Sequence, residues 1–586
     1  MCGIAGLVGQ PDADVIERLS DGMAHRGPDG QGAYRNGPCA LVHTRLAIVD
    51  LKTGDQPFVE YSDDGAEVAL IANGEIYNNL ELRERLPDVT FKTRSDCEPP
   101  LHLYLKYGLD FVDLLRGMYA IAIWDSAKQS LVLSRDPFGI KPLYYATTSR
   151  GFAFASEPAV LVAAGLVEAK LNTDKRDELL QLQFTTGQDL AFQGIHRVLP
   201  GESLRIEGGE IVERRIRAAL PSAGVRNIPE AQALKELDDV MTYSVGVHQR
   251  SDVPYGMFLS GGIDSSALLA MMKRMNSEPV LAFTAGFSGT AVADERELAR
   301  TLAKSQGAKH IEIDFGADDF WASLPGVVKH MDDPVADYAV LPTWKLAEKA
   351  RAEGIKVVLA GEGGDELFAG YGRYRTANRW LLSKDMYRKG ILDGLGVLRN
   401  EDASQAWRSG MVQAKQETRQ TGRTKLQNVQ AQDIQTWLPC DLLVKLDRML
   451  MAHGVEGRVP FVDMEMAKFA FALPDNLKIK DGLGKHILRQ WLNTALPAAK
   501  PFAKKRGFTV PVGAWIANDG VRAGQLVAEQ DCIASICKPD VVKDLFKHSE
   551  GRAAKAAWTL LFYALWHKIH MDGVLPEGQA LDVLSA

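Results

Sequence analysis

The feature that most restricts the fold of this chain is an alternation of strand-like and helix-like segments that begins near residue 230. Segment 230–247 has a helical pattern, with Leu234, Leu237, Met241 and Val245 along one face. The strands expected after it are 253–259, 280–284, 310–314 and 355–360, and the helices between them are 266–275, 295–305 and 341–352. Such alternation predicts a parallel sheet wrapped by helices. The last third of the chain is predicted to be mostly helical.

The part before residue 200 has a different pattern. Apolar runs at 40–43, 68–72, 119–124 and 131–134 have strand length and end at turn-forming or polar residues. Helices are fewer and are expected at 15–23 and 100–107. Turn-forming residues become frequent after Gly201 and again between Pro221 and Pro229. We therefore predict a first domain at 1–208, a linker at 209–229 and a second domain at 230–586.

Composition excludes several classes of protein. The chain of 586 residues has a net charge of −7 and contains no basic run, so we expect no nucleic-acid partner and no anionic membrane partner. No segment approaches the roughly 20 apolar residues of a membrane span, and the start does not resemble a signal peptide. The six cysteines are too sparse for a disulfide framework. These features favour a cytoplasmic location, where a reactive thiol stays reduced.

The chain begins Met1-Cys2-Gly3-Ile4, and removal of Met1 would make Cys2 the first residue. The α-amine of Cys2 would then lie beside its own thiol. An α-amine has an unperturbed pKa of roughly 8, so it can take the thiol proton near neutral pH. A nucleophile activated by its own terminal amine is a known arrangement. The alternative is that Cys2 is simply the second residue of a cytosolic protein.

A second motif, Ser260-Gly261-Gly262-Ile263-Asp264-Ser265-Ser266, follows a predicted strand and precedes a predicted helix. Glycines let the backbone approach an anion, and the helix start offers unpaired N–H groups. Asp264 is unusual beside an anion unless a cation bridges it to phosphate, as Mg²⁺ does. No lysine follows the glycines, so this is not a Walker A loop. A capped helix after a turn is the alternative interpretation.

A third motif, Gly361-Glu362-Gly363-Gly364-Asp365-Glu366, follows the predicted strand 355–360. In open α/β sheets, ligands bind beyond the carboxyl ends of the strands. Two strand ends that each carry glycine and a carboxylate could hold one Mg²⁺–nucleotide between them. The alternative is a solvated acidic turn.

Together these residues resemble the glutamine-dependent asparagine synthetases, and the resemblance covers nearly the whole chain. In the first part it rests on Met1-Cys2-Gly3-Ile4, His25-Arg26-Gly27-Pro28-Asp29, Arg45-Leu46-Ala47-Ile48-Val49-Asp50, Asn73-Gly74-Glu75-Ile76-Tyr77-Asn78, Ser95-Asp96-Cys97-Glu98, Arg116-Gly117-Met118 and Arg135-Asp136-Pro137-Phe138-Gly139. In the second part it rests on the two glycine motifs, Gly454-Val455-Glu456-Gly457-Arg458-Val459-Pro460-Phe461 and Lys485-His486-Ile487-Leu488-Arg489.

The resemblance implies a two-domain protein of α+β and α/β class. The first domain would be a class II glutaminase, an αββα sandwich with an N-terminal nucleophile. The second would be an ATP pyrophosphatase domain with a Rossmann-like parallel sheet and a helical C-terminal part. The resemblance also implies a homodimer.

Roles in the glutaminase follow by resemblance. Cys2 would attack the side-chain amide of glutamine, and Asn73 and Gly74 would form the oxyanion hole. Arg45 would bind the α-carboxylate of glutamine, because a guanidinium pairs with a carboxylate through two hydrogen bonds. Glu75 and Asp96 would take the α-amine. Outside this context, ion pairs and a hairpin turn would be the simpler interpretations.

Roles in the second domain follow in the same way, with ATP as substrate and Mg²⁺ as cofactor. The residues assigned to ATP are Leu259, Ser260, Gly261, Gly262, Asp264, Ser265, Ala285, Ala360, Gly361 and Lys485. Asp264 and Asp365 would hold Mg²⁺, and Glu362 would take a proton from attacking ammonia. A lysine on a solvated helix face is the alternative for Lys485.

The implied reaction joins the two sites. Glutamine hydrolysis at Cys2 would supply ammonia to a β-aspartyl-AMP made from aspartate and ATP, giving asparagine, glutamate, AMP and pyrophosphate. Ammonia protonated in water has no lone pair for attack, so a dry path between the domains is predicted. Segment 332–343 is expected to line the acceptor pocket, and it departs from the best-characterised members of the family. The alternatives are therefore an amidotransferase for another carboxylate (peptide, sugar or metabolite), a β-lactam-type synthetase and a non-enzymatic sensor.

Overall fold

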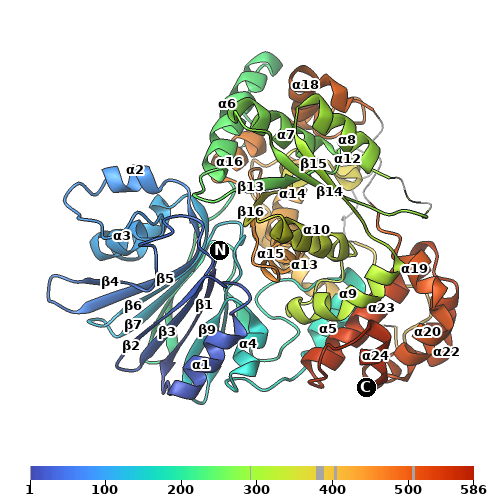
Figure 1. The fold of residues 1–586 in the computed structure, drawn as a ribbon, viewed down its shortest axis with the longest axis horizontal. Helices are drawn as coiled ribbons and strands as arrows, with labels where there is room; N and C mark the ends of the chain where they lie inside the picture. Colours follow the sequence, from blue (N-terminus) through green and yellow to red (C-terminus); the bar gives the residue numbers. More distant parts are fainter. Residues whose placement is uncertain are drawn as a thin grey trace.

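The structure is a computed structural model that describes residues 2–222, 224–290, 292, 294–377, 388–401, 405–503 and 509–586. Its N-terminal part contains two six-stranded antiparallel sheets (Figure 1). The first has the order β10-β8-β9-β1-β3-β2, with β1 (Cys2–Gly9), β2 (Gly30–Asn36), β3 (Cys39–Arg45), β8 (Tyr144–Thr148), β9 (Gly151–Ala155) and β10 (His196–Arg197). The second has the order β12-β11-β7-β6-β5-β4, with β4 (Phe58–Tyr61), β5 (Glu67–Ile76), β6 (Gly117–Asp125), β7 (Ser130–Arg135), β11 (Glu202–Glu207) and β12 (Glu210–Ile216).

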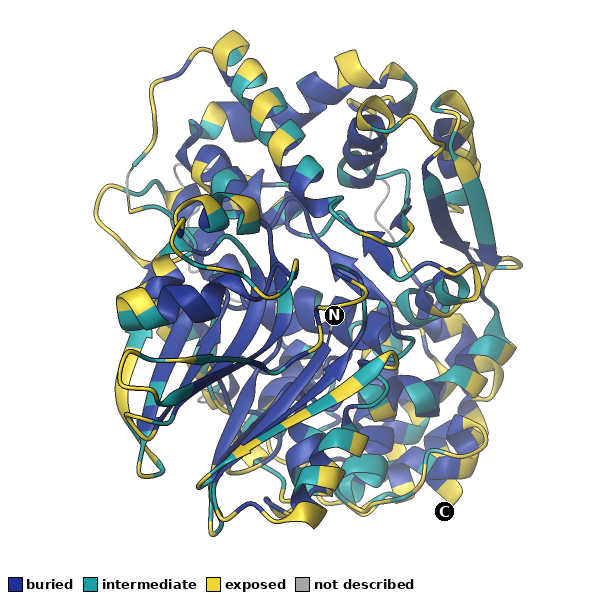
Figure 2. Cartoon of the chain, turned by 60° about the vertical axis from the view of Figure 1, so that its left-hand side comes forward, coloured by how far each residue is buried: buried dark blue, intermediate teal, exposed yellow. Residues whose placement is uncertain are grey.

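The two sheets pack face to face over a common apolar core. Ile4 and Leu41 of the first sheet lie in one buried cluster with Ile71, Ala122 and Leu133 of the second. Strands such as β6 and β7 are apolar throughout because both of their faces are covered. Figure 2 shows these strands buried along most of their length.

Helices cover the two outer faces of this sandwich. Helices α1 (Ala13–Gly22) and α4 (Pro158–Ala163) pack on the first sheet, since Val15 and Val160 share a cluster with Ala5 and Leu7. Helices α2 (Asn79–Glu84) and α3 (Pro99–Tyr107), with the 3₁₀ turn η1 (Gly108–Leu114), pack on the second sheet. The layers are therefore αββα, and this expectation is confirmed.

The strand β12 lies inside the segment that we predicted to be a linker. It pairs antiparallel with β11, so the second sheet continues to Ile216. The domain boundaries themselves stay a prediction. Helix α5 (Thr173–Leu182) follows β9 and α4 and packs against the C-terminal part of the chain.

The second part contains the predicted parallel sheet. Its order is β15-β14-β13-β16-β17, with β13 (Tyr255–Phe258), β14 (Leu281–Gly286), β15 (Lys309–Asp314), β16 (Val357–Leu359) and β17 (Glu456–Arg458). Helix α6 (Glu230–His248) precedes these strands, and α7 (Ile263–Met275), α8 (Arg296–Ser305), α9 (Ala317–His330) and α10 (Val340–Ala352) lie between them. Strand β17 was not predicted, because three residues show too little periodicity to be recognised.

The rest of the described chain is helical, as expected. Its elements are α11 (Gly364–Leu367), α12 (Gly372–Ala377), η2 (Ala406–Arg408), α13 (Ser409–Thr418), α14 (Lys425–Gln435), η3 (Leu438–Leu442), α15 (Leu443–Met451), α16 (Met464–Ala472), α17 (Asp475–Lys478), α18 (His486–Ala495), η4 (Pro497–Ala499), α19 (Val512–Asn518), α20 (Gly520–Glu529), α21 (Asp531–Ala534), α22 (Pro539–Lys547), α23 (Gly551–His570) and α24 (Ala580–Ser585). Among the helices described, none combines the length and the apolar character needed to cross a membrane.

Buried arginine–carboxylate pairs join the two parts. Arg26 Nη1 lies 2.9 Å from Asp447 Oδ2, and neither side chain is more than 3% exposed. Arg197 Nη2 contacts Asp333 Oδ1 at 2.5 Å, and Arg116 Nη2 contacts Asp463 Oδ1 at 2.7 Å. Each pair joins a residue before the predicted linker to one after it, so the pairs fix how the two parts sit together.

Replacing Asp447 by alanine should destabilise the protein, because Arg26 would lose a buried counter-ion. Breaking a buried ion pair in this way costs about 3 kcal/mol of unfolding free energy. Thermal and denaturant unfolding of Asp447→Ala measure the loss. Asp14→Ala is the control, since Asp14 pairs with Arg18 on an exposed helix face and should cost less than about 1 kcal/mol. Equal losses in the two variants would contradict the structural role of the buried pair.

Candidate functional site

Cys2 lies at the start of β1, in the interior of the first sheet. Antiparallel pairing places it opposite Arg45, the last residue of β3. Arg26 Nε donates to the carbonyl oxygen of Cys2 at 3.2 Å, and Cys2 itself is 8% exposed. Burial raises the pKa of the Cys2 thiol, whereas the Leu46 backbone and the Arg45 guanidinium act in the opposite direction. Met1 is outside the described residues, so its removal stays a prediction.

The predicted oxyanion hole lies on β5, next to Cys2. The backbone N–H of Cys2 donates to Asn73 Oδ1 at 3.1 Å. The other end of this amide, Asn73 Nδ2, is buried and has no hydrogen-bond partner in the described part of the chain. Gly74 packs so closely on β6 that a Cβ atom would lie 2.2 Å from the carbonyl oxygen of Met118. A free buried donor beside a thiol is the arrangement that a developing oxyanion requires.

The residues assigned to the ends of glutamine are also brought to this region. Arg45 Nη1 pairs with Asp55 Oδ1 at 2.7 Å, and Arg45 Nη2 donates to the carbonyl oxygen of Asp50 at 2.5 Å. Asp96 accepts from the backbone N–H of Ile76 at 2.6 Å. Asp55 is 78% exposed, so a substrate carboxylate can displace it from Arg45 at little cost.

Glu75 makes a contact that the sequence did not predict. Its Oε2 atom lies 2.9 Å from Arg458 Nη2 of β17, and both side chains are buried. Burial raises the pKa of Glu75 well above its usual range, Arg458 lowers it, and Asp96 raises it further. Glu75 thus links the region around Cys2 to the second part of the chain. Arg458 stands inside one of the motifs that we noted, but nothing in its spacing indicated this partner.

The glycine loop after β13 has the form of an anion site. Ser260 Oγ and Ser265 Oγ lie 3.1 Å apart, and the N–H of Gly262 donates to Ser260 Oγ at 3.3 Å. Gly261 has a φ of +68°, a left-handed conformation that favours glycine. Helix α7 begins directly behind the loop and points its N-terminus toward it. The loop can therefore present both hydroxyl and backbone donors to a phosphate.

Apolar residues at the neighbouring strand ends complete this edge of the sheet. Leu259 N donates to Phe283 O at 2.9 Å, and Thr284 Oγ1 donates to Leu259 O at 2.5 Å. Ala285 lies in β14 and Ala360 directly follows β16, and both are buried. At Gly361 a Cβ atom would lie 3.0 Å from Asp264 Cβ, so the two glycine motifs touch.

Lys485 joins the two carboxylates that were assigned to a metal. It precedes α18 with a φ of +60°, and its ammonium group lies 2.8 Å from Asp365 Oδ1 and also contacts Asp264 Oδ2. Burial lowers the pKa of Lys485, but the two carboxylates more than offset this and hold it above its usual value. Two carboxylates already converge on one cation here. Their oxygen donors therefore fit Mg²⁺, a hard cation that prefers such ligands.

Glu362 lies in the second glycine motif, shortly after β16, and interacts with the charged side chain of Lys445. Burial raises its pKa, Lys445 of α15 lowers it, and Asp264 raises it. Lys445 Nζ in turn pairs with Asp337 Oδ2 at 2.7 Å. Sequence reasoning missed Lys445, which lies in a helical segment without a recognisable motif.

The segment expected to line the acceptor pocket divides into two parts. Asp333 accepts from Arg197 and Tyr144, and Asp332 accepts from the N–H of Ala159 at 3.0 Å, so both acids hold the two parts of the chain together. Among these three acids, Asp337 is the one that pairs with Lys445 near Glu362. The acids at the start of the segment are therefore bound by the buried arginines Arg197 and Arg448, and the lining of the acceptor pocket stays a prediction.

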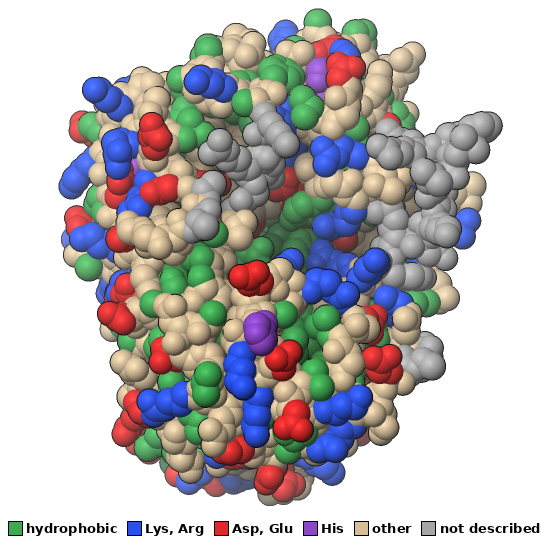
Figure 3. All heavy atoms as spheres, turned by 90° about the vertical axis from the view of Figure 1, so that its right-hand side faces the viewer, with side chains coloured by type: hydrophobic (Ala, Val, Ile, Leu, Met, Phe, Trp, Pro, Cys, Tyr) green, Lys and Arg blue, Asp and Glu red, His purple; other side chains and the backbone are tan. Residues whose placement is uncertain are grey.

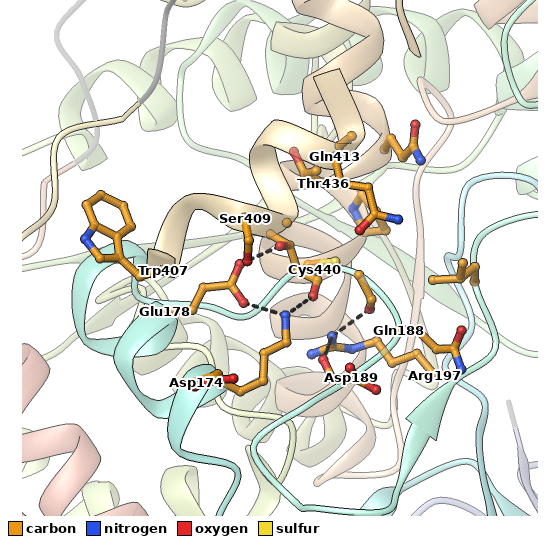
Figure 4. A pocket seen from close by; sticks show the side chains of 18 of the residues that line it. Asp174, Glu178, Gln188, Asp189, Arg197, Trp407, Ser409, Gln413, Thr436 and Cys440 are labelled. Atoms are coloured by element: carbon orange, nitrogen blue, oxygen red, sulfur yellow. Dashed lines mark hydrogen bonds and ion pairs between the residues drawn. The ribbon is translucent and has the colours of Figure 1, made fainter. Parts of the chain in front are cut away.

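A separate cavity of about 1280 Å³ lies between α5 and the helices η2, α13 and α14. Glu178, Arg197, Trp407 and Cys440 surround it (Figure 4). Its polar groups largely satisfy one another, as Glu178 does with Lys175 and Thr186. None of the predicted site residues lines it. The space-filling view shows a recess with hydrophobic and basic side chains on one face (Figure 3).

Comparison with known proteins agrees with this arrangement. The glutamine amidotransferase domain family matches residues 1–216, and the asparagine synthase family matches residues 236–568. Asparagine synthetase [glutamine-hydrolyzing] 1 of Bacillus subtilis is 30% identical, covering 98% of this chain and 97% of its own. Asparagine synthetase B of Escherichia coli is 31% identical over 90% of this chain and 86% of its own. Amidase chyE of Penicillium rubens is 32% identical over 64% of this chain and 60% of its own. The chain belongs to the asparagine synthase family.

Proposed function

We propose that this chain is a glutamine-hydrolysing asparagine synthetase that uses ATP to activate the side-chain carboxylate of aspartate. The observation that carries the proposal is the free, buried Nδ2 donor of Asn73 beside Cys2. A donor left without a partner in a buried site costs free energy unless a ligand uses it. The family relation and the second site at Lys485 support the same proposal.

In the first half-reaction, the Cys2 thiolate attacks the side-chain carbonyl carbon of glutamine. The negative charge that grows on the carbonyl oxygen is stabilised by Asn73 Nδ2 and by the N–H of Gly74. Ammonia leaves, and water then hydrolyses the thioester to release glutamate. Arg45 binds the α-carboxylate of glutamine, and Asp96 and Glu75 take its α-amine.

In the second half-reaction, the aspartate carboxylate attacks the α-phosphorus of ATP and pyrophosphate leaves. The loop from Ser260 to Ser265 and the Lys485 ammonium bind the phosphates. Asp264 and Asp365 would hold Mg²⁺, which would neutralise phosphate charge. Ammonia then attacks the acyl-adenylate, Glu362 takes the proton, and AMP leaves.

The raised pKa of Glu362 suits this last role. A carboxylate with a raised pKa is a stronger base than an exposed one, and proton transfer is most efficient when the pKa is near the working pH. The charge of Lys445 acts against this shift and lowers the pKa of Glu362. The runner-up proposal is an acceptor other than aspartate, which the departures in segment 332–343 support.

The proposal predicts that Cys2→Ala abolishes glutamine-dependent synthesis and spares synthesis from ammonium. The thiol is needed only to release ammonia, so the adenylate site stays intact. Pyrophosphate and amide product are measured with ATP, Mg²⁺, aspartate and either nitrogen donor. Cys532→Ala serves as the control, because Cys532 is far from both sites in sequence. Loss of ammonium-dependent synthesis in folded Cys2→Ala would contradict the two-site scheme.

Lys485→Met should show the opposite pattern to Cys2→Ala: synthesis is impaired with either nitrogen donor, and glutamine hydrolysis is spared. Without the ammonium group, phosphate charge in the transition state loses its stabilisation, and pyrophosphate release falls by about 100-fold or more with either donor. Glutamine hydrolysis, measured as glutamate release, should continue and shows that the variant is folded. Lys480→Met is the matched control, because Lys480 forms a largely exposed pair with Glu230. Normal pyrophosphate release by Lys485→Met would contradict the assignment of Lys485 to the phosphate site.

A further inference from the structure

One helix face leads away from Glu362 and carries charged groups that the proposed mechanism does not use. The π-helix η3 continues directly into α15. Trp437, Asp441 and Lys445 follow one another at intervals of four residues, so they lie near one face, about one turn apart. π-Helices are rare and are frequent at functional sites.

Asp441 is a buried carboxyl group, and no described residue forms a hydrogen bond to its Oδ1 atom. The residue is 2% exposed. Burial raises its pKa to about 8, the Asp337 carboxylate adds to the shift, and Lys445 and Arg388 lower it. Buried polar groups are nearly always hydrogen-bonded, so a partner for this Oδ1 atom is missing.

Arg388 is a partly buried cation that lies over Trp437, at one end of this helix face. Its guanidinium lies 3.3 Å from the ring centroid of Trp437, which fixes its orientation. Its Nη2 atom is buried and makes no hydrogen bond to any described residue. Burial lowers the pKa of Arg388, the charge of Arg373 lowers it further, and the acids Asp433 and Asp441 act against this.

The two unpaired groups lie beside the Lys445–Asp337 pair, which connects them to Glu362. Lys445 interacts with Asp337, Asp441 and Glu362, so it stands between the helix face and the reacting centre. The Asp441 carboxylate and the Arg388 guanidinium each have a buried atom without a hydrogen bond in the described structure, and together they are complementary to a zwitterion. One ligand with an ammonium and a carboxylate would satisfy both.

We propose that Asp441 and Arg388 recognise the α-ammonium and the α-carboxylate of an amino-acid acceptor, whose second carboxylate is activated near Glu362. This rests on the proposed function and assigns residues to its acceptor pocket. Asp337 and Lys445 pair with each other at 2.7 Å, and Lys445 shares the helix face with Asp441. Both unpaired groups of the pocket thus gain a charged partner when the acceptor binds.

The test uses three acceptors with ammonium chloride as nitrogen donor, so that the glutaminase does not limit the rate. Aspartate carries both groups, succinate lacks the ammonium, and 3-aminopropanoate lacks the α-carboxylate. Steady-state pyrophosphate release is measured for the wild-type enzyme, Asp441→Asn and Arg388→Gln. Glutamine hydrolysis and the KM for ATP report whether each variant is otherwise intact.

The two variants should lose activity with different acceptors. Asp441→Asn should lower kcat/KM for aspartate and 3-aminopropanoate by about tenfold or more and leave succinate unchanged, because only succinate lacks the ammonium. Arg388→Gln should lower kcat/KM for aspartate and succinate by a similar factor and leave 3-aminopropanoate unchanged. The losses should appear mainly in the KM for the acceptor, and Arg388→Lys should restore part of the activity.

Arg423→Gln is the matched control. The Arg423 guanidinium also lies over an aromatic ring, 5.0 Å from the centroid of Phe471, and it donates to the main-chain carbonyl oxygens of Thr418 and Pro221. It is not on the helix face, so its replacement should leave all three acceptors unchanged. Equal losses with all three acceptors, or no loss with aspartate, in Asp441→Asn and Arg388→Gln would overturn the proposal.

Failure of the proposed function gives a different result. A wild-type enzyme inactive with aspartate but active with another amino-acid carboxylate would contradict aspartate as acceptor. The proposed roles of Asp441 and Arg388 would still be supported if Asp441→Asn lowers kcat/KM for that acceptor by about tenfold. Activity confined to carboxylates without an amino group would overturn the proposed roles of Asp441 and Arg388.

Discussion

The structure depends on charges that are buried between its two parts. Arg458 of β17 is fully buried, and its guanidinium bonds Glu75, Glu456 and the carbonyl oxygens of His248 and Arg250. A buried ion is costly unless its geometry is satisfied completely, so such a group tolerates little displacement. Arg26, which is paired with Asp447, donates to the carbonyl oxygen of Cys2 and so limits the displacement of that backbone too. The reactive ends of the two parts are thereby held in one fixed relation.

If the proposed function holds, this constraint also explains how one chain divides the chemistry between two sites. Cys2 begins β1 and contacts Asn73 of β5 in the facing sheet, and Asp264 and Asp365 follow two strands of the parallel sheet. Strand ends place short polar side chains accurately because the sheet behind them is rigid. Glu75 is assigned to the proposed glutamine site and is paired with Arg458 of the second part, so the pair connects the two parts directly.

The sequence predicted more of the fold than of the contacts. Strand and helix alternation located the parallel sheet, and apolar runs located the strands of the sandwich, because these patterns repeat over many residues. The glycine motifs and Cys2 located the candidate sites, since their residue types are restricted by chemistry. Segment 332–343 shows the limit: we expected it to line the acceptor pocket, but two of its acids are bound by arginines that are distant in sequence. The partners of Glu75, Asp337 and Asp441 depend on long-range packing that no local pattern encodes.

The central claim is that ammonia released at Cys2 reaches the acyl-adenylate inside the protein. Supplying glutamine labelled with ¹⁵N in its side-chain amide, together with excess unlabelled ammonium, tests it most directly. The amide product should then keep nearly all of the ¹⁵N, because transfer within the fixed interface does not exchange with solvent. A product whose isotope ratio matches the mixed ammonium pool would contradict the account.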